Sequence, residues 1–168
     1  MIGYMGCGKS SVGKEIAQST NSLFLDTDAW IEEKEQMTIS DIFASKGESY
    51  FRDLETECLK ELLEERIHVL ESKNVLSVGG GLPLKEENRK LLSQLGSVIY
   101  LKASPDTIYN RLKDDTSRPL LQGENPKKKI MEMMAVREEK YQDAANLVID
   151  VDGKTIAEIV EEIKWGRE

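Results

Sequence analysis

The sequence predicts an α/β fold in which helices pack around a parallel β-sheet. Short apolar runs alternate with longer helical patterns from one end of the chain to the other. A glycine-rich loop near the start is followed at once by a helix-forming run. The length of 168 residues suits a single domain covering 1–168, and 39% hydrophobic residues is ordinary for a globular protein.

The strands are predicted from short apolar runs, at Leu23–Leu25, Val75–Val78, Val98–Leu101 and Leu147–Val151. Helical spacing of apolar residues predicts helices at Ser10–Ser19, Glu48–Arg66, Lys85–Leu95, Asp106–Leu112, Lys127–Ala145 and Ile156–Trp165. Thr38 followed by Asp41 predicts the cap of a further short helix. Only Met1 and Ile2 precede the glycine loop, so either the first strand is unusually short or the chain lacks residues of its natural start.

Charge, apolar runs and cysteine and histidine content argue against several kinds of partner, site and enzyme. The net charge of −8 argues against nucleic acid and anionic membranes, which select basic surfaces. No apolar run reaches the ~20 residues of a membrane span. Cys7 and Cys58 are too few for a disulfide framework or a zinc site, so a reducing, cytoplasmic location is expected. His68 is the single histidine, which disfavours triad hydrolases and histidine-based metal sites.

The glycine-rich loop Gly3–Ser10 matches the eight-residue pattern of a phosphate-binding loop. Its glycines allow backbone N–H groups to point into a nest around phosphates, and the following helix adds its positive dipole end. In this pattern Lys9 reaches the β- and γ-phosphates and the Ser10 hydroxyl binds Mg²⁺. The loop therefore predicts an ATP-dependent enzyme.

Acidic and basic residues elsewhere supply the rest of a phosphoryl-transfer site. Asp26 and Asp28 follow a predicted strand, where ligands of parallel sheets bind, although such a pair is often only a turn or helix cap. Arg52 and Glu55 are spaced to form a surface ion pair, and Arg137 has similar surface partners as an alternative. The three glycines at 79–81 would let a ligand approach the backbone closely.

The polar segment at about 113–126 is expected to be a mobile lid that closes over the phosphates. It contains a single arginine, Arg118, together with Gly123 and two prolines. The alternative for Arg118 is a solvated side chain without a role.

In this order, these segments resemble shikimate kinase over nearly the whole chain. The matching segments are Gly3–Ser10, Asp26–Asp28, Gly47–Glu55, Gly79–Gly81, Arg118–Leu121 and Arg137 with Tyr141. The resemblance implies a three-layer α/β/α fold of the P-loop, nucleoside-monophosphate-kinase-like type, with five parallel strands and a lid. It also implies that ATP phosphorylates the 3-hydroxyl of shikimate to give shikimate 3-phosphate, a step toward chorismate and the aromatic amino acids.

The resemblance also assigns roles to individual residues. Asp28 holds the substrate hydroxyls and is the candidate base, Asp26 supports the metal with Ser10, and the substrate-binding region covers about 28–56. The expected shikimate contacts are Asp28, Arg52, Gly79, Gly80, Gly81 and Arg137. The expected ATP contacts are Gly6, Cys7, Gly8, Lys9, Ser10, Ser11, Arg111 and Arg118, with Lys9, Asp28 and Arg118 as the catalytic group. A further adenine contact is expected in the loop at 152–154.

The residue chemistry agrees with a small acidic polyol as substrate. Two arginines suit a planar carboxylate, and an aspartate accepts hydrogen bonds from hydroxyls. Charge alone leaves gluconate kinase, or another small-metabolite kinase, as an alternative. A catalytically silent nucleotide-binding regulator is the alternative from a different class. ATP, shikimate and Mg²⁺ are the expected ligands of a monomeric enzyme.

Trp30 and Cys7 give two further expectations. Trp30 lies two residues after Asp28, so its fluorescence is expected to report substrate binding, unless it is a core residue. Cys7 stands where serine or alanine is usual in the family. Its thiol is expected beside the phosphates and more reactive than that of Cys58, which helical spacing places in a core. The alternative is that Cys7 is only a small residue tolerated in the loop and shielded by its neighbours.

Overall fold

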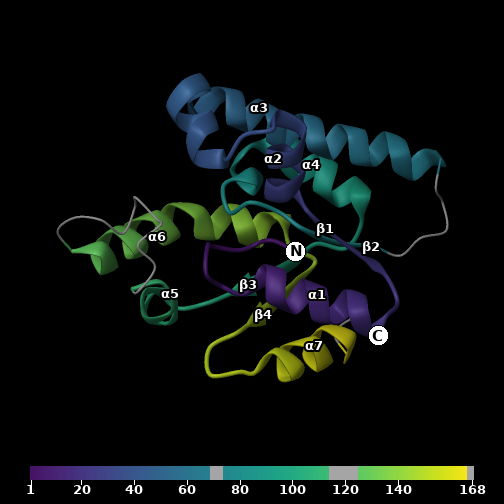
Figure 1. Cartoon of the computed structure of the whole chain (residues 1–168). Coiled ribbons are helices and arrows are strands. Elements are labelled where there is room, and N and C mark those ends of the chain that lie inside the picture. Colours follow the sequence, from purple (N-terminus) through teal and green to yellow (C-terminus); the bar gives the residue numbers. More distant parts are fainter. Residues whose placement is uncertain (69–73, 114–124, 166–168) are drawn as a thin grey trace.

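The computed structural model describes residues 1–68, 74–113 and 125–165. Helices α1 (Lys9–Ser19) and α7 (Ile156–Trp165) lie on one side of the strands, and α3 (Ile39–His68), α4 (Glu86–Leu95) and α6 (Pro126–Ala144) lie on the other (Figure 1). The α/β class predicted from the sequence is therefore confirmed. No helix in the described ranges is long and apolar enough to cross a membrane.

The strands form two parallel pairs. Strand β1 (Leu23–Asp26) pairs with β2 (Asn74–Ser77), and β3 (Ile99–Lys102) pairs with β4 (Leu147–Asp150). All four lie within one residue of the predicted runs. Because paired strands run in the same direction, their carboxyl ends meet at a common edge, where ligands of parallel sheets bind.

Met1 and Ile2 join the two pairs. The Ile2 amide donates to the Ile99 carbonyl at 2.9 Å, and the Leu101 amide donates back to the Ile2 carbonyl at 3.0 Å. On the other side, the Val78 amide donates to the Met1 carbonyl at 3.2 Å, and the Met1 amino group donates to the Leu76 carbonyl. This short extended segment lies between the two strand pairs and leads directly into the glycine loop.

The helices agree with the prediction except between β1 and α3. Helix α2 (Thr27–Glu35) was not expected, since Asp26 and Asp28 were interpreted mainly as a site. It forms because Asp26 is its N-cap, accepting from the amides of Asp28 at 3.0 Å and Ala29 at 3.5 Å. The remaining elements are α5 (Pro105–Leu112) and the short 3₁₀ helix η1 (Leu82–Leu84).

Helix α3 combines two predicted helices in one kinked element. Its first turn is capped as predicted, because the Asp41 amide donates to the Thr38 hydroxyl at 3.2 Å and that hydroxyl donates to the Asp41 carboxylate at 2.7 Å. Gly47 then interrupts the helix with φ 85° and ψ 168°, a conformation that glycine adopts without a steric penalty. The long second part, starting at Glu48, carries Arg52 and Glu55.

The core is divided into a large and a small cluster. The large cluster surrounds the strands and includes Ile2, Leu101 and Ile149, all at most 1% exposed. The small cluster packs α2 against α3 through Ile31, Ile42, Phe51 and Leu54. The predicted substrate-binding region therefore has its own packing beside the main core.

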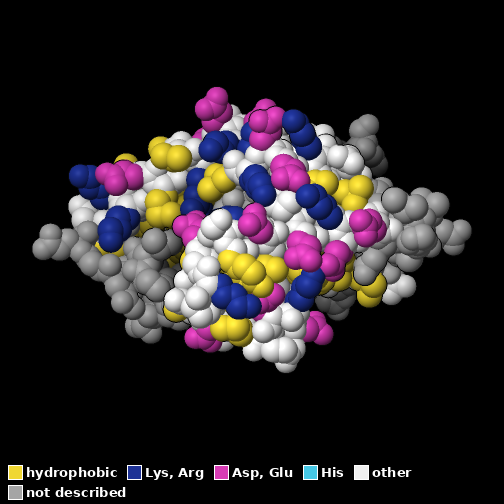
Figure 2. Space-filling model, turned by 90° about the horizontal axis from the view of Figure 1, so that it is seen from above, with side chains coloured by type: hydrophobic (Ala, Val, Ile, Leu, Met, Phe, Trp, Pro, Cys, Tyr) yellow, Lys and Arg dark blue, Asp and Glu magenta, His cyan; other side chains and the backbone are white. Residues whose placement is uncertain are grey.

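The outer surface over α3 carries charges of both signs. Figure 2 shows Lys and Arg side chains interspersed with Asp and Glu on this face. Ion pairs between α3 and its neighbouring helices include Lys34–Glu61, at 2.6 Å, and Lys60–Glu87, at 2.7 Å. Exposed pairs of this kind contribute little stability, about 0–1 kcal/mol each.

Candidate active site

The glycine loop is built as a backbone nest. Gly3, Gly6 and Gly8 have φ of 143°, 76° and 105°, which side-chain-bearing residues rarely adopt. Gly8 is the N-cap of α1 and no side chain caps it, so the first amides of the helix stay available to a ligand. The Lys9 ammonium donates to the carbonyls of Gly3 at 2.8 Å and Tyr4 at 3.2 Å, which places a positive charge across the loop.

Ser10 and Asp26 lie together at the edge of this nest. The Ser10 hydroxyl donates to the Asp26 Oδ2 at 3.2 Å, while the Asp26 Oδ1 is held by the amides of α2. A hydroxyl and a carboxylate are the hard oxygen donors that Mg²⁺ prefers. Mg²⁺ is usually bound by one or two carboxylates together with substrate phosphates, so this pair fits the predicted metal without further acidic ligands.

Asp28 lies deeper, against the glycines that follow β2. Its Oδ1 is buried and has no hydrogen-bond partner in the described part of the chain. Burial raises the pKa of the Asp28 carboxyl above its usual value, and the nearby Asp26 charge raises it further, while Lys9 acts in the opposite direction. A buried acceptor without a partner is suited to receive a hydrogen bond from a ligand hydroxyl.

Glu55 is a site residue that the sequence reasoning left as half of a surface ion pair. It is 0% exposed, and its Oε2 accepts from Arg52 at 2.9 Å. Burial raises the pKa of Glu55 to about 7, against the lowering effect of Arg52 and with the help of the Asp28 charge. Its Oε1, like the Asp28 Oδ1, is buried and without a partner among the described residues.

Two of the three glycines at 79–81 lie in close contact with charged side chains. A Cβ on Gly79 would lie 2.7 Å from the Asp28 Oδ1 and 3.0 Å from the Glu55 Oε1. A Cβ on Gly81 would lie 2.3 Å from an Arg52 guanidinium nitrogen. A side chain at Gly79 would therefore displace the Asp28 carboxylate, and one at Gly81 would displace the Arg52 guanidinium. The turn brings the backbone against the two unpartnered carboxylate oxygens.

Arg52 and Arg137 flank this turn from different helices. Arg52 extends from α3 and is held by Glu55 and by Glu48, whose Oε1 lies 2.9 Å from it. Arg137 extends from α6, with its guanidinium carbon 5.3 Å from the centre of the Tyr4 ring and one of its nitrogens 3.7 Å from the Cβ position of Gly80. Two guanidinium groups thus border one stretch of backbone.

A cavity of about 490 Å³ connects most of the predicted residues. The predicted site residues that line it are Gly6, Cys7, Gly8, Lys9, Ser10, Ser11, Asp26, Asp28, Gly79, Gly80 and Arg111. Lys154 from the predicted adenine loop also lines it. Gly81, Arg52 and Arg137 are not among its lining residues and lie behind or beside the glycine turn.

Arg111 has a contact that was not predicted. Its guanidinium donates to the carbonyls of Gly6 at 3.1 Å and Cys7 at 3.0 Å. The side chain therefore holds the glycine loop from outside, in addition to bordering the cavity in which a nucleotide base is expected.

The side chain of Cys7 packs into the core. The side chain is 1% exposed and belongs to the large core cluster, with Sγ 3.9 Å from the Lys9 ammonium and only 2.8 Å from the Cβ position of Gly3. The thiol is therefore shielded by its neighbours, because the tight loop turns the sulfur inward, and its greater reactivity stays a prediction. Cys58 is 0% exposed, as predicted.

Trp30 and Arg118 complete the predicted set. Trp30 packs against the small cluster, with the Lys34 ammonium 4.5 Å from its ring centre, and is not among the residues lining the cavity. Its use as a fluorescent reporter stays a prediction. Arg118 and most of the predicted lid lie outside the described residues.

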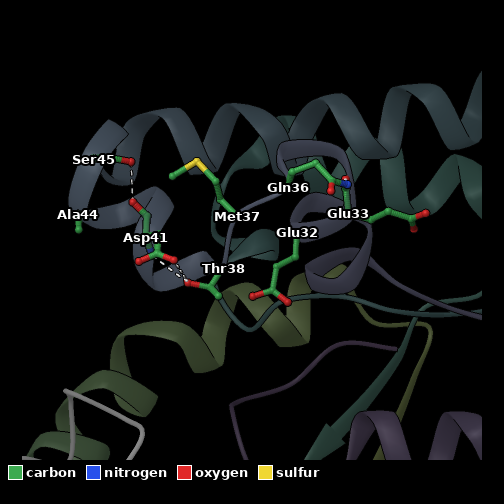
Figure 3. A pocket seen from close by; sticks show the side chains of 8 residues that line it. All are labelled: Glu32, Glu33, Gln36, Met37, Thr38, Asp41, Ala44 and Ser45. Atoms are coloured by element: carbon green, nitrogen blue, oxygen red, sulfur yellow. Dashed lines mark hydrogen bonds between the residues drawn. The ribbon is translucent and has the colours of Figure 1, made fainter.

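A second, shallower pocket lies between α2 and the start of α3 (Figure 3). It is lined by Glu32, Glu33, Gln36, Met37, Thr38, Asp41, Ala44 and Ser45. Asp41 is bonded to Thr38, and Glu32 accepts from the Ile39 amide at 2.9 Å. The carboxylates of this pocket would repel phosphates and other anions, so it does not compete with the glycine-loop cavity as the active site.

Comparisons with known proteins agree with this geometry. The family model for shikimate kinase matches residues 5–165. A shikimate kinase from Thermodesulfovibrio yellowstonii is 42% identical over 163 residues, covering 97% of this chain and 90% of the relative. A structure of shikimate kinase from Acinetobacter baumannii in complex with shikimate has a TM-score of 0.87 and 35% identity, covering 97% of this chain and 88% of the other.

A gluconokinase from Sinorhizobium meliloti shares the fold more distantly. Its structure has a TM-score of 0.54 and 19% identity, covering 98% of this chain and 87% of the other. The fold is therefore that of the P-loop kinases related to nucleoside-monophosphate kinases, and the enzyme class is an ATP-dependent phosphotransferase with an alcohol acceptor. From the matched family model and the identity over nearly its whole length, the chain belongs to the shikimate kinase family.

Proposed function

We propose that this enzyme transfers the γ-phosphoryl group of ATP to the 3-hydroxyl of shikimate. The observation that carries the proposal is the glycine turn flanked by Arg52 and Arg137, with Asp28 buried against it and the phosphate-binding loop opposite. Two guanidinium groups suit the carboxylate of the substrate, and a buried carboxylate suits its hydroxyls. The shikimate bound by the Acinetobacter baumannii relative supports the same assignment.

On the nucleotide side, the chain's contribution is binding and orientation. The amides of Gly6, Gly8, Lys9, Ser10 and Ser11 would surround the phosphates, and the Lys9 ammonium would leave its loop carbonyls for phosphate oxygens. Ser10 and Asp26 would hold Mg²⁺, which neutralises charge developing on the phosphates when bound. Arg111 would support the loop and border the adenine. The backbone of Cys7, not its thiol, would contribute to the nest.

On the acceptor side, the chain orients the substrate and removes a proton. Arg52, Arg137 and the Gly80 amide would hold the carboxylate, next to Gly79 and Gly81. Asp28 would accept a hydrogen bond from the reacting hydroxyl and then its proton. The raised pKa of Asp28 suits a general base, whose efficiency is greatest when its pKa approaches the working pH.

Several finer features belong to the same proposal. Arg118, on a lid at about 113–126, would join Lys9 in stabilising the transferred phosphoryl group, as in the family. The hydrogen bonds of Met1 and Ile2 support a sheet of five parallel strands with this segment at its centre. One domain covering 1–168, with a substrate-binding region at about 28–56, a monomeric state and a cytoplasmic location are further proposals.

Acceptor-dependent release of ADP tests the proposal. The enzyme is assayed with MgATP and either shikimate, gluconate or no acceptor, with coupled detection of ADP. We expect rapid release with shikimate and only background release in the other two reactions. Release with gluconate in place of shikimate would assign the alternative kinase, and nucleotide binding without turnover for any acceptor would assign a silent regulator.

A further inference from the structure

The central peptide of the glycine turn is held by one side chain. The Leu82 amide donates to the Gly79 carbonyl at 3.1 Å, which makes Gly79–Leu82 a β-turn with Gly80 and Gly81 at its centre. The carbonyl of Gly80 belongs to the peptide between these two glycines. It accepts a hydrogen bond of 2.6 Å from the hydroxyl of Tyr141.

Glycine at both central positions leaves the orientation of this peptide undecided. Type I and type II turns differ mainly by a flip of the central peptide, and type II requires a positive φ at the third residue. Gly81 has φ −88° and ψ −18°, which are the values of a type I turn. Because glycine adopts positive φ readily, Gly81 itself does not prevent the flip. The Gly79 amide, which donates to the Thr27 hydroxyl at 3.0 Å, and the Gly81 carbonyl, which accepts from the Leu84 amide at 3.1 Å, hold the two ends of the turn. Of the bonds described, the one from Tyr141 is made to the central peptide itself.

Tyr141 is placed to favour the observed orientation of the central peptide. It lies one helical turn after Arg137 on α6, is 1% exposed, and packs its ring against Tyr100 with 5.1 Å between the ring centres. Burial raises the pKa of Tyr141 to about 12, while Arg137 lowers it through its charge and a side-chain hydrogen bond, so the hydroxyl stays protonated and remains a donor. A flip of the peptide would remove the acceptor of this buried hydroxyl, which is unfavourable.

The orientation of this peptide determines which backbone groups face the two arginines. In a planar trans peptide the carbonyl and the N–H point in opposite directions. Holding the Gly80 carbonyl toward α6 therefore fixes the direction of the Gly81 N–H and the geometry of the adjoining Gly80 amide. These groups lie between Arg52, next to Gly81, and Arg137, next to Gly80.

We propose that Tyr141 is a positioning residue for the acceptor, which locks the Gly79–Leu82 turn in its binding form through its bond to the Gly80 carbonyl. The proposal rests on the proposed function in that it takes shikimate as the ligand of this turn. Tyr141 itself makes no contact with the substrate in this account. Its effect passes through the backbone of Gly80 and Gly81. The hydroxyl also interacts with the side chain of Arg137, and the NMR signals of the two glycines report the backbone route separately.

The test is a Tyr141→Phe variant, compared with a Tyr100→Phe control. Tyr141→Phe keeps the ring and removes only the hydroxyl. Tyr100 is its stacked neighbour, is 2% exposed, and donates its hydroxyl to Glu138 at 2.6 Å, away from the turn. The control therefore removes a comparably buried hydroxyl from the same aromatic pair.

We expect Tyr141→Phe to raise the KM for shikimate about five- to thirtyfold, the loss typical of one buried hydrogen bond. The KM for ATP should stay within about twofold of the wild-type value, since the phosphate loop is untouched. Tyr100→Phe should leave both KM values unchanged, whatever it does to the melting temperature. Amide NMR signals of Gly80 and Gly81 should broaden or shift only in Tyr141→Phe.

Three outcomes would overturn the proposal: an unchanged KM for shikimate in Tyr141→Phe, equal increases in both KM values, or the same increase in Tyr100→Phe. The NMR comparison decides the matter independently if the variant is too unstable for kinetics. Failure of the proposed function gives a different result, because the wild-type enzyme would then release no ADP with shikimate.

Discussion

The two sides of the active site are built by different means. On the nucleotide side, the contiguous loop Gly3–Ser10 supplies nearly everything through backbone conformation, with one lysine held across it. On the acceptor side, charged side chains from α2, α3 and α6 converge on a glycine turn that adds only backbone groups to the site. Local sequence determines the conformation of the glycine loop, which Arg111 of α5 supports, whereas tertiary packing determines the acceptor side.

The two sides also differ in the free-energy cost of their polar groups when no ligand is bound. The loop amides need no ligand to remain stable, because they face a cavity open to water. The acceptor side buries Asp28 and Glu55 with an unpartnered oxygen each, as far as the described residues show. Unpartnered buried oxygens are unfavourable until a ligand or a proton reaches them. A substrate with hydroxyl groups would relieve this cost by donating hydrogen bonds to the two oxygens.

The largest effect is expected from removing the base on the acceptor side. Asp28→Asn keeps the shape of the side chain but cannot take the hydroxyl proton. We expect kcat to fall about 10²–10⁴-fold, the usual contribution of a general base, with the KM for ATP near the wild-type value. Steady-state kinetics with both substrates varied measures this. Activity within a few-fold of wild type would show that Asp28 is neither base nor essential for orientation.

The pH dependence of stability should reveal the buried Glu55. Its pKa rises from 4.5 in the unfolded chain to about 7 in the folded protein, chiefly because of burial. The folded state therefore holds a proton that the unfolded chain has lost, and the free energy of unfolding contributed by this group decreases as the pH rises from 4.5 to 7. The full shift corresponds to at most about 3 kcal/mol.

Glu55→Gln removes this titration while keeping an acceptor for Arg52. The melting temperature of the variant should change less between pH 5 and 8 than that of the wild type, with the curves separating toward the alkaline end. Thermal unfolding at a series of pH values measures the difference. Parallel curves would mean that Glu55 stays ionised throughout and that Arg52 outweighs its burial.

The smallest effect is expected at Cys7, on the nucleotide side. Since its side chain packs in the core, Cys7→Ala should lower stability by about 1 kcal/mol, or about 2–4 °C in melting temperature, and leave the KM for ATP unchanged. Cys58→Ala is the matched control, since that thiol is equally buried but lies on α3, away from the loop. A rise in the KM for ATP in Cys7→Ala alone would place the thiol beside the phosphates after all.

The sequence predicted the conformation of the glycine loop well because its residues are contiguous. The spacing of Gly3, Gly8, Lys9 and Ser10 is itself the structure of the loop, and the strands were predicted to within one residue because buried parallel strands are continuous apolar runs. Helix α2 was missed because Asp26 acts both as a cap and beside Ser10, and a single residue pattern does not reveal two roles.

The acceptor side was predicted mainly through resemblance to a family. Nothing in the spacing of Arg52 and Glu55 distinguishes a buried pair from a surface pair, because burial depends on the strands and glycines that pack above them. The bond from Tyr141 to Gly80 joins positions 61 residues apart, so no local pattern could indicate it. The inward turn of the Cys7 side chain likewise follows from loop geometry and not from the residue type.

The central claim, that the two sides are built and act separately, is tested most directly by calorimetric titration of an Arg137→Ala variant. Arg137 borders the glycine turn but is not among the residues lining the cavity of the phosphate loop. Removing one member of a buried charge pair costs about 2–5 kcal/mol, so shikimate binding should weaken more than tenfold. Binding of a non-hydrolysable ATP analogue should stay within about twofold of wild type. Equal losses of affinity for both ligands in a folded variant would contradict the account.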